Sequence, residues 1–295
     1  MKHIAAGRCL TYAYLVASSL LFIYPLLFMA CGSLGTLDDY YRTRVIPIPS
    51  HPTLVAYATI LRSGLWRATQ ITLLRVIWYL GLALTVSLFG GYVFSRLRFA
   101  GRSFMLMFFL SGLTIPGILM SLPIYVMLAR WPLSGGNDLL GQGGHGLVDQ
   151  FPALFILGIV DAFGMFLVKQ TYDMLPGEYE EAAIMDGAGL FTIIFRIYAP
   201  LLKPVLTALT VITVVGVWND YFYPFLLVSG NRELTPIALA VQRMINGMAS
   251  WGSVATTPFP ALFAGAVLMS APPIALYLAL QRSFVQGLVG VGLRG

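Results

Sequence analysis

The sequence predicts an all-α, polytopic membrane protein. Of its 295 residues, 58% are hydrophobic and only 10% are charged, and the mean hydropathy is +0.81. A soluble core of this size could not hide so much apolar surface. Six windows along the chain approach the roughly 20 apolar residues that a helix needs to cross a bilayer. We therefore expect six transmembrane helices.

Each expected span is bounded by Arg or Lys, by Asn or Asp, or by clusters of Gly and Pro. The spans cover residues 10–32, 71–94, 104–128, 152–170, 205–228 and 259–281. Residues 1–70 then form an amino-terminal helix with an extracytoplasmic loop, and residues 71–295 form a core of five helices. Pro116 and Pro123 are expected to kink the third span.

The distribution of basic residues predicts the orientation. If the amino terminus is cytoplasmic, the short inner segments carry ten Lys and Arg, whereas the longer outer loops carry seven. Basic residues concentrate on the cytoplasmic side of membrane proteins. We therefore expect a multi-pass protein of the cell inner membrane with both termini in the cytoplasm. The net charge of +6 reflects this bias, and we do not expect nucleic-acid binding.

The few potential metal ligands are scattered and lack the spacing of a metal site. They are Cys9, Cys31, His3, His51 and His145. We expect neither a metal nor a cofactor on this chain.

The segment "PGEYEEAAIMDGAGL", residues 176–190, is polar and rich in small residues. Pro176 suits the first turn of a helix, and the glutamates among residues 178–181 would lie near the positive end of its dipole. Gly187 and Gly189 favour an end to this helix and a turn before the next apolar stretch. The residues alone leave two interpretations open, a docking surface for another protein and an ordinary amphipathic connector.

The same segment resembles the cytoplasmic motif of the membrane subunits of ATP-binding-cassette (ABC) importers, E-A-A, three residues, G, nine residues, then I-x-L-P. Ala199 departs from this pattern, which usually has leucine there. The resemblance implies that residues 173–200 form a coupling loop that docks on an ATPase subunit. The residues that it assigns to ATPase coupling are Glu181, Ala182, Ala183, Asp186, Gly187, Ile197 and Pro200.

The resemblance covers nearly the whole chain and is strongest to the maltose-permease-type subfamily of carbohydrate importers. The stretches that carry it are "PSHPTLVAY", "SRLRFAGR", "TIPGILMSLPIY", "VWNDYFYPFLL" and "QRSFVQGL". It implies the type I importer fold and a non-catalytic permease subunit. It further implies four kinds of partner: a second permease, more often a different chain than an identical one, two ATPase subunits, an extracytoplasmic solute-binding protein and a sugar substrate.

Two nucleotide-binding patterns can be set aside. The chain has no G-x-x-x-x-G-K-[ST], because none of its lysines follows a glycine, so any ATP must be bound by a partner subunit. Gly141, Gly143 and Gly146 fit G-x-G-x-x-G, but that motif requires a strand before it and a helix after it. We expect a flexible extracytoplasmic loop there, which could contact the solute-binding protein.

Ionisable residues inside a membrane are costly and need an explanation. For Arg75 we favour a structural role, either an ion pair with one of the aspartates that fixes helix packing or a position, shared with Asp220, close enough to an interface to reach water. Asp161 and Asp220 could instead face a polar translocation path. The residues proposed for that path are Asp161, Trp218, Asn219, Asp220 and Tyr221.

Two classes of function follow. The first is the permease subunit of an ATP-driven importer, and the second is an autonomous secondary transporter that uses Asp161 for proton coupling. A secondary transporter would often show two related halves, and the sequence has no clear internal repeat. An intramembrane enzyme is a distant third, since the sequence offers no nucleophile or metal constellation.

Overall fold

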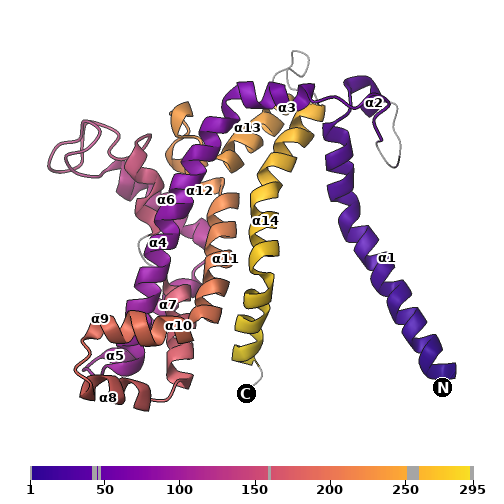
Figure 1. The fold of residues 1–295 in the computed structure, drawn as a ribbon. Coiled ribbons are helices and arrows are strands. Elements are labelled where there is room, and N and C mark those ends of the chain that lie inside the picture. Colours follow the sequence, from indigo (N-terminus) through magenta and orange to yellow (C-terminus); the bar gives the residue numbers. More distant parts are fainter. Residues whose placement is uncertain (1, 42–44, 46–47, 159–160, 251–258, 293–295) are drawn as a thin grey trace. The chain divides into compact units, whose positions relative to one another are not determined.

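Figure 1 shows a computed structural model of the chain, which describes residues 2–41, 45, 48–158, 161–250 and 259–292. These residues form helices, turns and loops, and no strand occurs among them. The all-α prediction is therefore confirmed.

The chain divides into two compact units that are each discontinuous in sequence. One unit comprises residues 1–66 and 240–272, and the other comprises residues 67–239 and 273–295. Three helices, α4, α13 and α14, contain residues of both units.

The first unit contains the long helix α1 (Lys2–Ser33), the short helices α2 (Leu37–Tyr41) and α3 (Val55–Ile60), and the π-helical turn η1 (Leu61–Leu65). It also holds most of α13 (Ile237–Ser250) and the first part of α14 (Phe259–Gly292). Aromatic contacts join α2 to α14, where the ring of Tyr40 stacks on that of Phe259 at 4.1 Å between centroids.

Helix α2 begins with a reciprocal pair of caps. The Asp39 backbone N–H donates to Thr36 Oγ1, and the Asp39 carboxylate accepts from the backbone N–H and the hydroxyl of Thr36. The Ser50 backbone N–H donates to the other carboxylate oxygen. The bond from the Thr36 backbone N–H has the largest effect, and together these bonds hold the pKa of Asp39 well below its usual range. The same bonds tie the loop after α1 to the start of α2.

The second unit is built around α4, which together with its neighbours supplies the residues of the candidate sites. Its remaining elements are α5 (Arg102–Ser111), η2 (Gly112–Thr114), α6 (Gly117–Ala129), η3 (Phe151–Leu154), η4 (Ile156–Gly158), α7 (Ala162–Met174), α8 (Glu178–Met185), α9 (Leu190–Thr192), η5 (Ile193–Tyr198), α10 (Ala199–Leu201), α11 (Lys203–Asn219), α12 (Phe222–Leu227) and η6 (Arg232–Leu234), with α4 itself running from Trp66 to Arg96. Figure 1 shows α5, α8 and α9 near one end of α4 and α6 nearer the other.

Three helices of the described chain are long and apolar enough to span a membrane. They cover residues Leu10–Ser33, Val55–Arg96 and Phe259–Gln281, which contain the predicted spans 10–32, 71–94 and 259–281 in full. Two bent pairs of helices bring the total to as many as five if each pair is one span. The chain is therefore a multi-pass membrane protein.

The third predicted span is broken and not merely kinked. Helices Arg102–Thr114 and Gly117–Ala129 meet at an angle of 102°, and the break falls at Ile115 and Pro116, both of which have extended backbone ψ angles. Proline disfavours helical geometry in the residue before it, which explains the position of the break. Pro123 lies inside α6.

The fourth and fifth predicted spans have different bounds in the structure. Residues 151–158 form two short 3₁₀ turns, and α7 starts only at Ala162. The prediction of a single helix over 152–170 was therefore wrong. Residues 159–160 of that span lie outside the described residues. The fifth span was also predicted too long at its end, because α11 stops at Asn219 and α12 begins after a break at Asp220.

The loop of residues 130–150 is compact, because hydrogen bonds to the Asn137 side chain fold it back on itself. The Asn137 side chain donates to the carbonyls of Ala129 at 2.9 Å and Trp131 at 3.0 Å, and it accepts from the backbone N–H of Gly144 at 2.8 Å. One buried amide thus ties three points of the loop together.

The glycines of the G-x-G-x-x-G pattern serve this loop. Gly141, Gly143 and Gly146 have φ angles of 73°, 100° and 60°. A Cβ on Gly141 would lie 2.1 Å from the carbonyl oxygen of Arg130, and one on Gly146 would lie 2.3 Å from that of Leu128. The pattern therefore reflects backbone geometry and close packing.

Candidate coupling surface and intramembrane polar cluster

Helix α8 ends where its sequence predicts, but it starts at Glu178 after the N-cap Gly177, so Pro176 precedes the helix and does not lie in its first turn. Glu178, Glu180 and Glu181 occupy its first turn, where the helix dipole favours negative charge. At its other end Gly187 has a φ angle of 79°. The Gly187 N–H donates to the Ile184 carbonyl at 3.0 Å, and the Ala188 N–H donates to the Ala183 carbonyl at 2.9 Å. This pair of bonds is a Schellman motif, which needs a left-handed residue at the position of Gly187.

The predicted coupling residues divide between two faces of this segment. Glu181, Ala182, Asp186 and Gly187 are exposed on α8 and its turn. Ala183 is instead buried in a core cluster with residues of α4, α7 and η5. The E-A-A motif thus contributes both to an outward surface and to the anchor behind it.

The second half of the motif lies on a π-helical stretch. Ile197 belongs to η5 and packs against the same core cluster as Ala183, whereas Pro200 in α10 is exposed. Pro200 has no N–H to donate to the carbonyl four residues before it. The π-helical turns of η5, which are wider than α-helical turns, end two residues before this proline. The helical segment Leu190–Leu201 then meets α11 at an angle of 81°.

Glu180 anchors the inward face of α8. Its carboxylate accepts hydrogen bonds from the hydroxyls of Tyr92, near the end of α4, and Tyr198, at the end of η5. Arg96 lies beside it, with Nε 3.9 Å from Glu180 Oε2. The sequence singled out Glu180 only as a residue of the first turn, although its spacing of three from Ala183 places both on one helix face.

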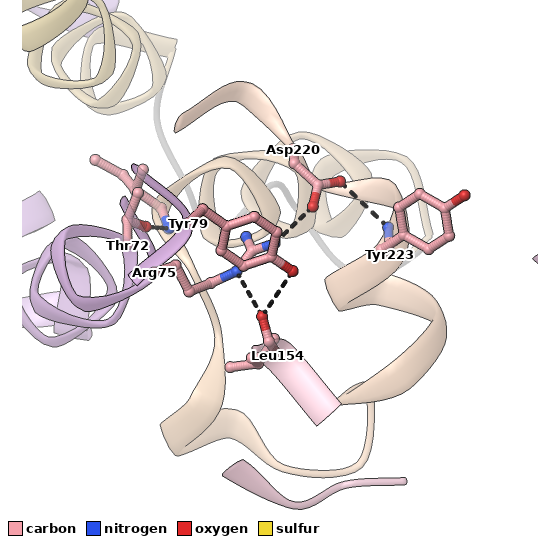
Figure 2. Close-up of polar contacts among 7 residues, drawn as sticks. Thr72, Arg75, Tyr79, Leu154, Asp220 and Tyr223 are labelled. Atoms are coloured by element: carbon pink, nitrogen blue, oxygen red, sulfur yellow. Dashed lines mark hydrogen bonds and ion pairs between the residues drawn. The ribbon is translucent and has the colours of Figure 1, made fainter. Parts of the chain in front are cut away.

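A second polar cluster surrounds Arg75, whose side chain is only 2% exposed (Figure 2). Arg75 Nη2 donates to Asp220 Oδ2 at 2.6 Å, and Arg75 Nε and the Tyr79 hydroxyl both donate to the Leu154 carbonyl. The Tyr223 backbone N–H donates to Asp220 Oδ1. The predicted pairing of Arg75 with an aspartate is confirmed, and that aspartate is Asp220.

This cluster holds together three parts of the second unit. Arg75 is on α4, Leu154 ends η3, and Asp220 fills the break between α11 and α12. A buried ion pair needs additional hydrogen bonds to offset its desolvation, and the carbonyl of Leu154 and the N–H of Tyr223 supply them. Tyr79 and Leu154 were not found from the sequence, because only the fold brings them to Arg75.

Asp161 lies at the start of a helix and not in the middle of a span as predicted. It is the N-cap of α7 and accepts a hydrogen bond from the Gly164 N–H at 2.9 Å. Asp161 is also one of the residues that line an open pocket of about 510 Å³. The pocket is lined by Phe108, Phe109, Ser111, Gly112, Leu113, Ile115, Asp161, Ala162 and Phe163.

The other residues proposed for the translocation path lie at the end of α11, away from this pocket's lining. Trp218 is 2% exposed, whereas Asn219 is exposed and donates to the carbonyl of Val215 in its own helix. Tyr221 is 46% exposed. The structure therefore groups Asp220 with Arg75 and places Asp161 in a different environment.

Residues 83–290 match a family model described as "Binding-protein-dependent transport system inner membrane component". The chain belongs to this family. It is a permease, a non-catalytic subunit of an ABC importer, and it works with partner subunits in the inner membrane. The family decides between the two classes of transporter in favour of the ATP-driven one.

Curated relatives match the permease over almost its full length. The sn-glycerol-3-phosphate transport system permease protein UgpE of Brucella melitensis is 27% identical, with 93% of each chain covered. The lactose transport system permease protein LacG of Rhizobium radiobacter is 26% identical over 95% of this chain and 94% of the relative. The galactooligosaccharides transport system permease protein GanQ of Bacillus subtilis is 27% identical over 97% and 95%.

A solved structure confirms the fold of the permease. The chain superposes with a TM-score of 0.80 on one chain from the crystal structure of a bacterial ABC transporter involved in the import of the acidic polysaccharide alginate. The two chains are 21% identical, and the match covers 96% of this chain and 98% of the other. The predicted importer fold is thereby confirmed.

Proposed function

We propose that this permease imports a carbohydrate or a related polyhydroxy solute and docks its ATPase subunit through the outward face of α8. The observation that carries the docking role is the division of α8 into two faces. Small and acidic residues are exposed, namely Glu181, Ala182, Asp186 and Gly187, while Ala183 is buried. Small side chains let a partner backbone approach closely, and the two carboxylates can pair with basic groups on the partner.

The ATP is bound by the partner. The permease sequence contains no phosphate-binding loop of the G-x-x-x-x-G-K-[ST] type, and a docking segment supplies the link to a subunit that has one. The chain itself then needs no cofactor.

The assembly contains two ATPase subunits, an extracytoplasmic solute-binding protein and a second permease that completes the translocation path. The resemblance to maltose-type permeases supports a second permease of different sequence. The compact loop of residues 130–150 is a candidate contact for the solute-binding protein. Both termini, and with them α8, lie on the cytoplasmic side, as the distribution of Lys and Arg indicates.

The docking role is tested with Gly187→Asp in the permease co-expressed with its second permease and ATPase. The substitution adds a side chain and a charge to the exposed turn, and we expect the ATPase to be lost from the purified complex while the two permeases stay together. Gly64→Asp in η1 is the matched control, since Gly64 likewise has a positive φ angle, is exposed and has no neighbour in reach of an added Cβ, and it lies in the segment expected on the opposite side of the membrane. Retention of the ATPase by the Gly187 variant would contradict the proposal.

The cargo is tested by uptake into proteoliposomes that contain the whole assembly. The relatives' names suggest three radiolabelled probes, namely lactose, a galactooligosaccharide and sn-glycerol 3-phosphate. We expect ATP-dependent accumulation of at least one sugar and competition by unlabelled sugars. Uptake that is confined to non-carbohydrate solutes such as amino acids would refute the cargo class and leave the docking role untouched.

A further inference from the structure

Glu180 is a partly buried carboxylate that the docking surface does not use. Its side chain is 16% exposed, and it lies three residues before the buried Ala183 on the inward face of α8. Residues three apart share a helix face, so Glu180 points away from the surface formed by Glu181 and Ala182.

Both oxygens of this carboxylate are engaged, and by different elements. The Tyr92 hydroxyl of α4 donates to Oε1, and the Tyr198 hydroxyl of η5 donates to Oε2 at 2.9 Å. An ionised carboxylate only accepts hydrogen bonds, so two hydroxyl donors suit it. Hydrogen bonds to an ionised group are about twice as strong as those between neutral groups.

Arg96, the last residue of α4, closes the arrangement. Its Nη2 donates to the carbonyls of Tyr172 at 2.9 Å and Leu175 at 2.7 Å, at the end of α7. Its guanidinium lies 5.3 Å from the centre of the Tyr198 ring and faces Glu180 with Nε at 3.9 Å. Arg96 therefore connects the ends of α4 and α7 to the same carboxylate.

Three tyrosine rings pack around this group. Tyr172 is 0% exposed, and its ring lies 4.9 Å from that of Tyr198 and 6.0 Å from that of Tyr92. Aromatic pairs at these distances add to stability beyond the area they bury. The rings leave the Tyr92 and Tyr198 hydroxyls little freedom to follow a displaced carboxylate, because their planes are fixed by one another.

We infer that Glu180 is a positioning residue that ties α8 to α4, η5 and, through Arg96, to α7, so that a movement of the docked ATPase moves these membrane helices. The inference rests on the docking role proposed above for α8. It separates two tasks within four residues of sequence: Glu181 and Ala182 meet the partner, and Glu180 and Ala183 hold the helix. Loss of the tie leaves α8 docked but free to move without the bundle.

The test compares Glu180→Gln with Glu178→Gln in the complete assembly. Gln keeps the size of the side chain but loses one acceptor and the charge that faces Arg96. Glu178 lies on the same turn and is exposed, so its variant controls for the loss of charge alone. Tyr198→Phe removes one hydroxyl from the same group and is the second variant if Glu180→Gln assembles poorly.

Two readouts are taken from each complex, the amount of ATPase that co-purifies and the rate of ATP hydrolysis in proteoliposomes without solute. For Glu180→Gln and Tyr198→Phe we expect a normal amount of ATPase and a hydrolysis rate raised by a factor of about 2 to 10, which corresponds to one hydrogen bond of ordinary strength. The reason is that the ATPase no longer has to move α4 and η5 during its cycle. Glu178→Gln should resemble the wild type.

Each other result contradicts the inference. A merely structural role would lower the amount of bound ATPase in proportion to the change in activity. Hydrolysis by Glu180→Gln equal to that of Glu178→Gln would show that the bonds transmit no restraint. If Gly187→Asp also retained the ATPase, the docking role would be wrong; if it released the ATPase, the failure would belong to the Glu180 inference alone.

Discussion

At the scale of single residues, the Arg75–Asp220 pair illustrates how a charge is kept inside a membrane bundle. Arg75 is 2% exposed and its partner 22%, and each also bonds to a backbone group. Removal of one partner would leave the other charge buried and uncompensated.

Arg75→Ala should therefore lower the free energy of unfolding by about 3 kcal/mol or more, measured by denaturant unfolding in detergent. Arg67→Ala, at an exposed position of the same helix, should change it by less than about 0.5 kcal/mol. The double variant Arg75→Leu, Asp220→Leu should recover most of the loss, since an apolar pair needs no compensation. If the recovered protein still transports, Asp220 serves packing and not the translocation path.

Asp161 can be tested in the same way, because its structural and chemical roles separate. Asn caps a helix about as well as Asp, whereas Ala does not. Asp161→Ala should cost about 1 kcal/mol of unfolding free energy, and Asp161→Asn should cost little. Loss of uptake in the stable Asp161→Asn variant would show that the path needs the charge; normal uptake in that variant would limit Asp161 to its role as a cap.

At the scale of elements, the end of α8 depends on the backbone conformation of one glycine. Gly187 has a φ angle of 79° and no neighbour within reach of an added Cβ, so Gly187→Ala strains the backbone without a clash. The cost should be about 1 kcal/mol, visible as faster amide hydrogen exchange over residues 183–188. Gly187→Asn should cost less, and Gly189→Ala should be nearly neutral because Gly189 is extended with φ at −79°. Equal exchange in all three variants would exclude the Schellman motif as the cause of the helix end.

The elements also show what could be predicted from the sequence. Local signals located α8, its terminal glycine and a kink near Pro116, because caps, turns and prolines act on adjacent residues; the structure has a full break there. The angle of 102° between the two halves of that span was not predictable, since it depends on packing. The run after Gln150 was mistaken for one helix because its apolar composition outweighed the signals of Pro152 and Gly158.

Contacts between residues that are far apart in the chain could not be predicted from the sequence. Arg75 and Asp220 are 145 residues apart and Tyr92 and Glu180 are 88. Because a buried charge is costly, the sequence predicted that Arg75 had an acidic partner, but it did not indicate whether the partner was Asp161 or Asp220. Nothing in the sequence around Tyr92, Arg96 or Tyr198 indicated that they meet Glu180.

At the scale of the whole molecule, the orientation in the membrane follows from the basic residues and remains a prediction. Green fluorescent protein fused to either terminus should fluoresce, because both termini are expected in the cytoplasm. Alkaline phosphatase fused within residues 137–142 should be active, because that loop is expected outside. The reverse pattern of activities would place α8 on the extracytoplasmic side of the membrane, where it could not meet a cytoplasmic ATPase. That result would contradict the docking role as well.

The two faces of α8 have a consequence for the design of hybrid transporters. In the proposed arrangement, the residues that hold the helix and those that meet the ATPase are different side chains on one short element. The outward side chains of Glu181, Ala182 and Asp186 can therefore be replaced by those of another permease while Glu180 and Ala183 are kept, together with Gly187, whose backbone ends the helix. Such a graft of a few residues should redirect the permease to a foreign ATPase and leave its cargo unchanged, so the motor and the pathway can be exchanged as separate modules.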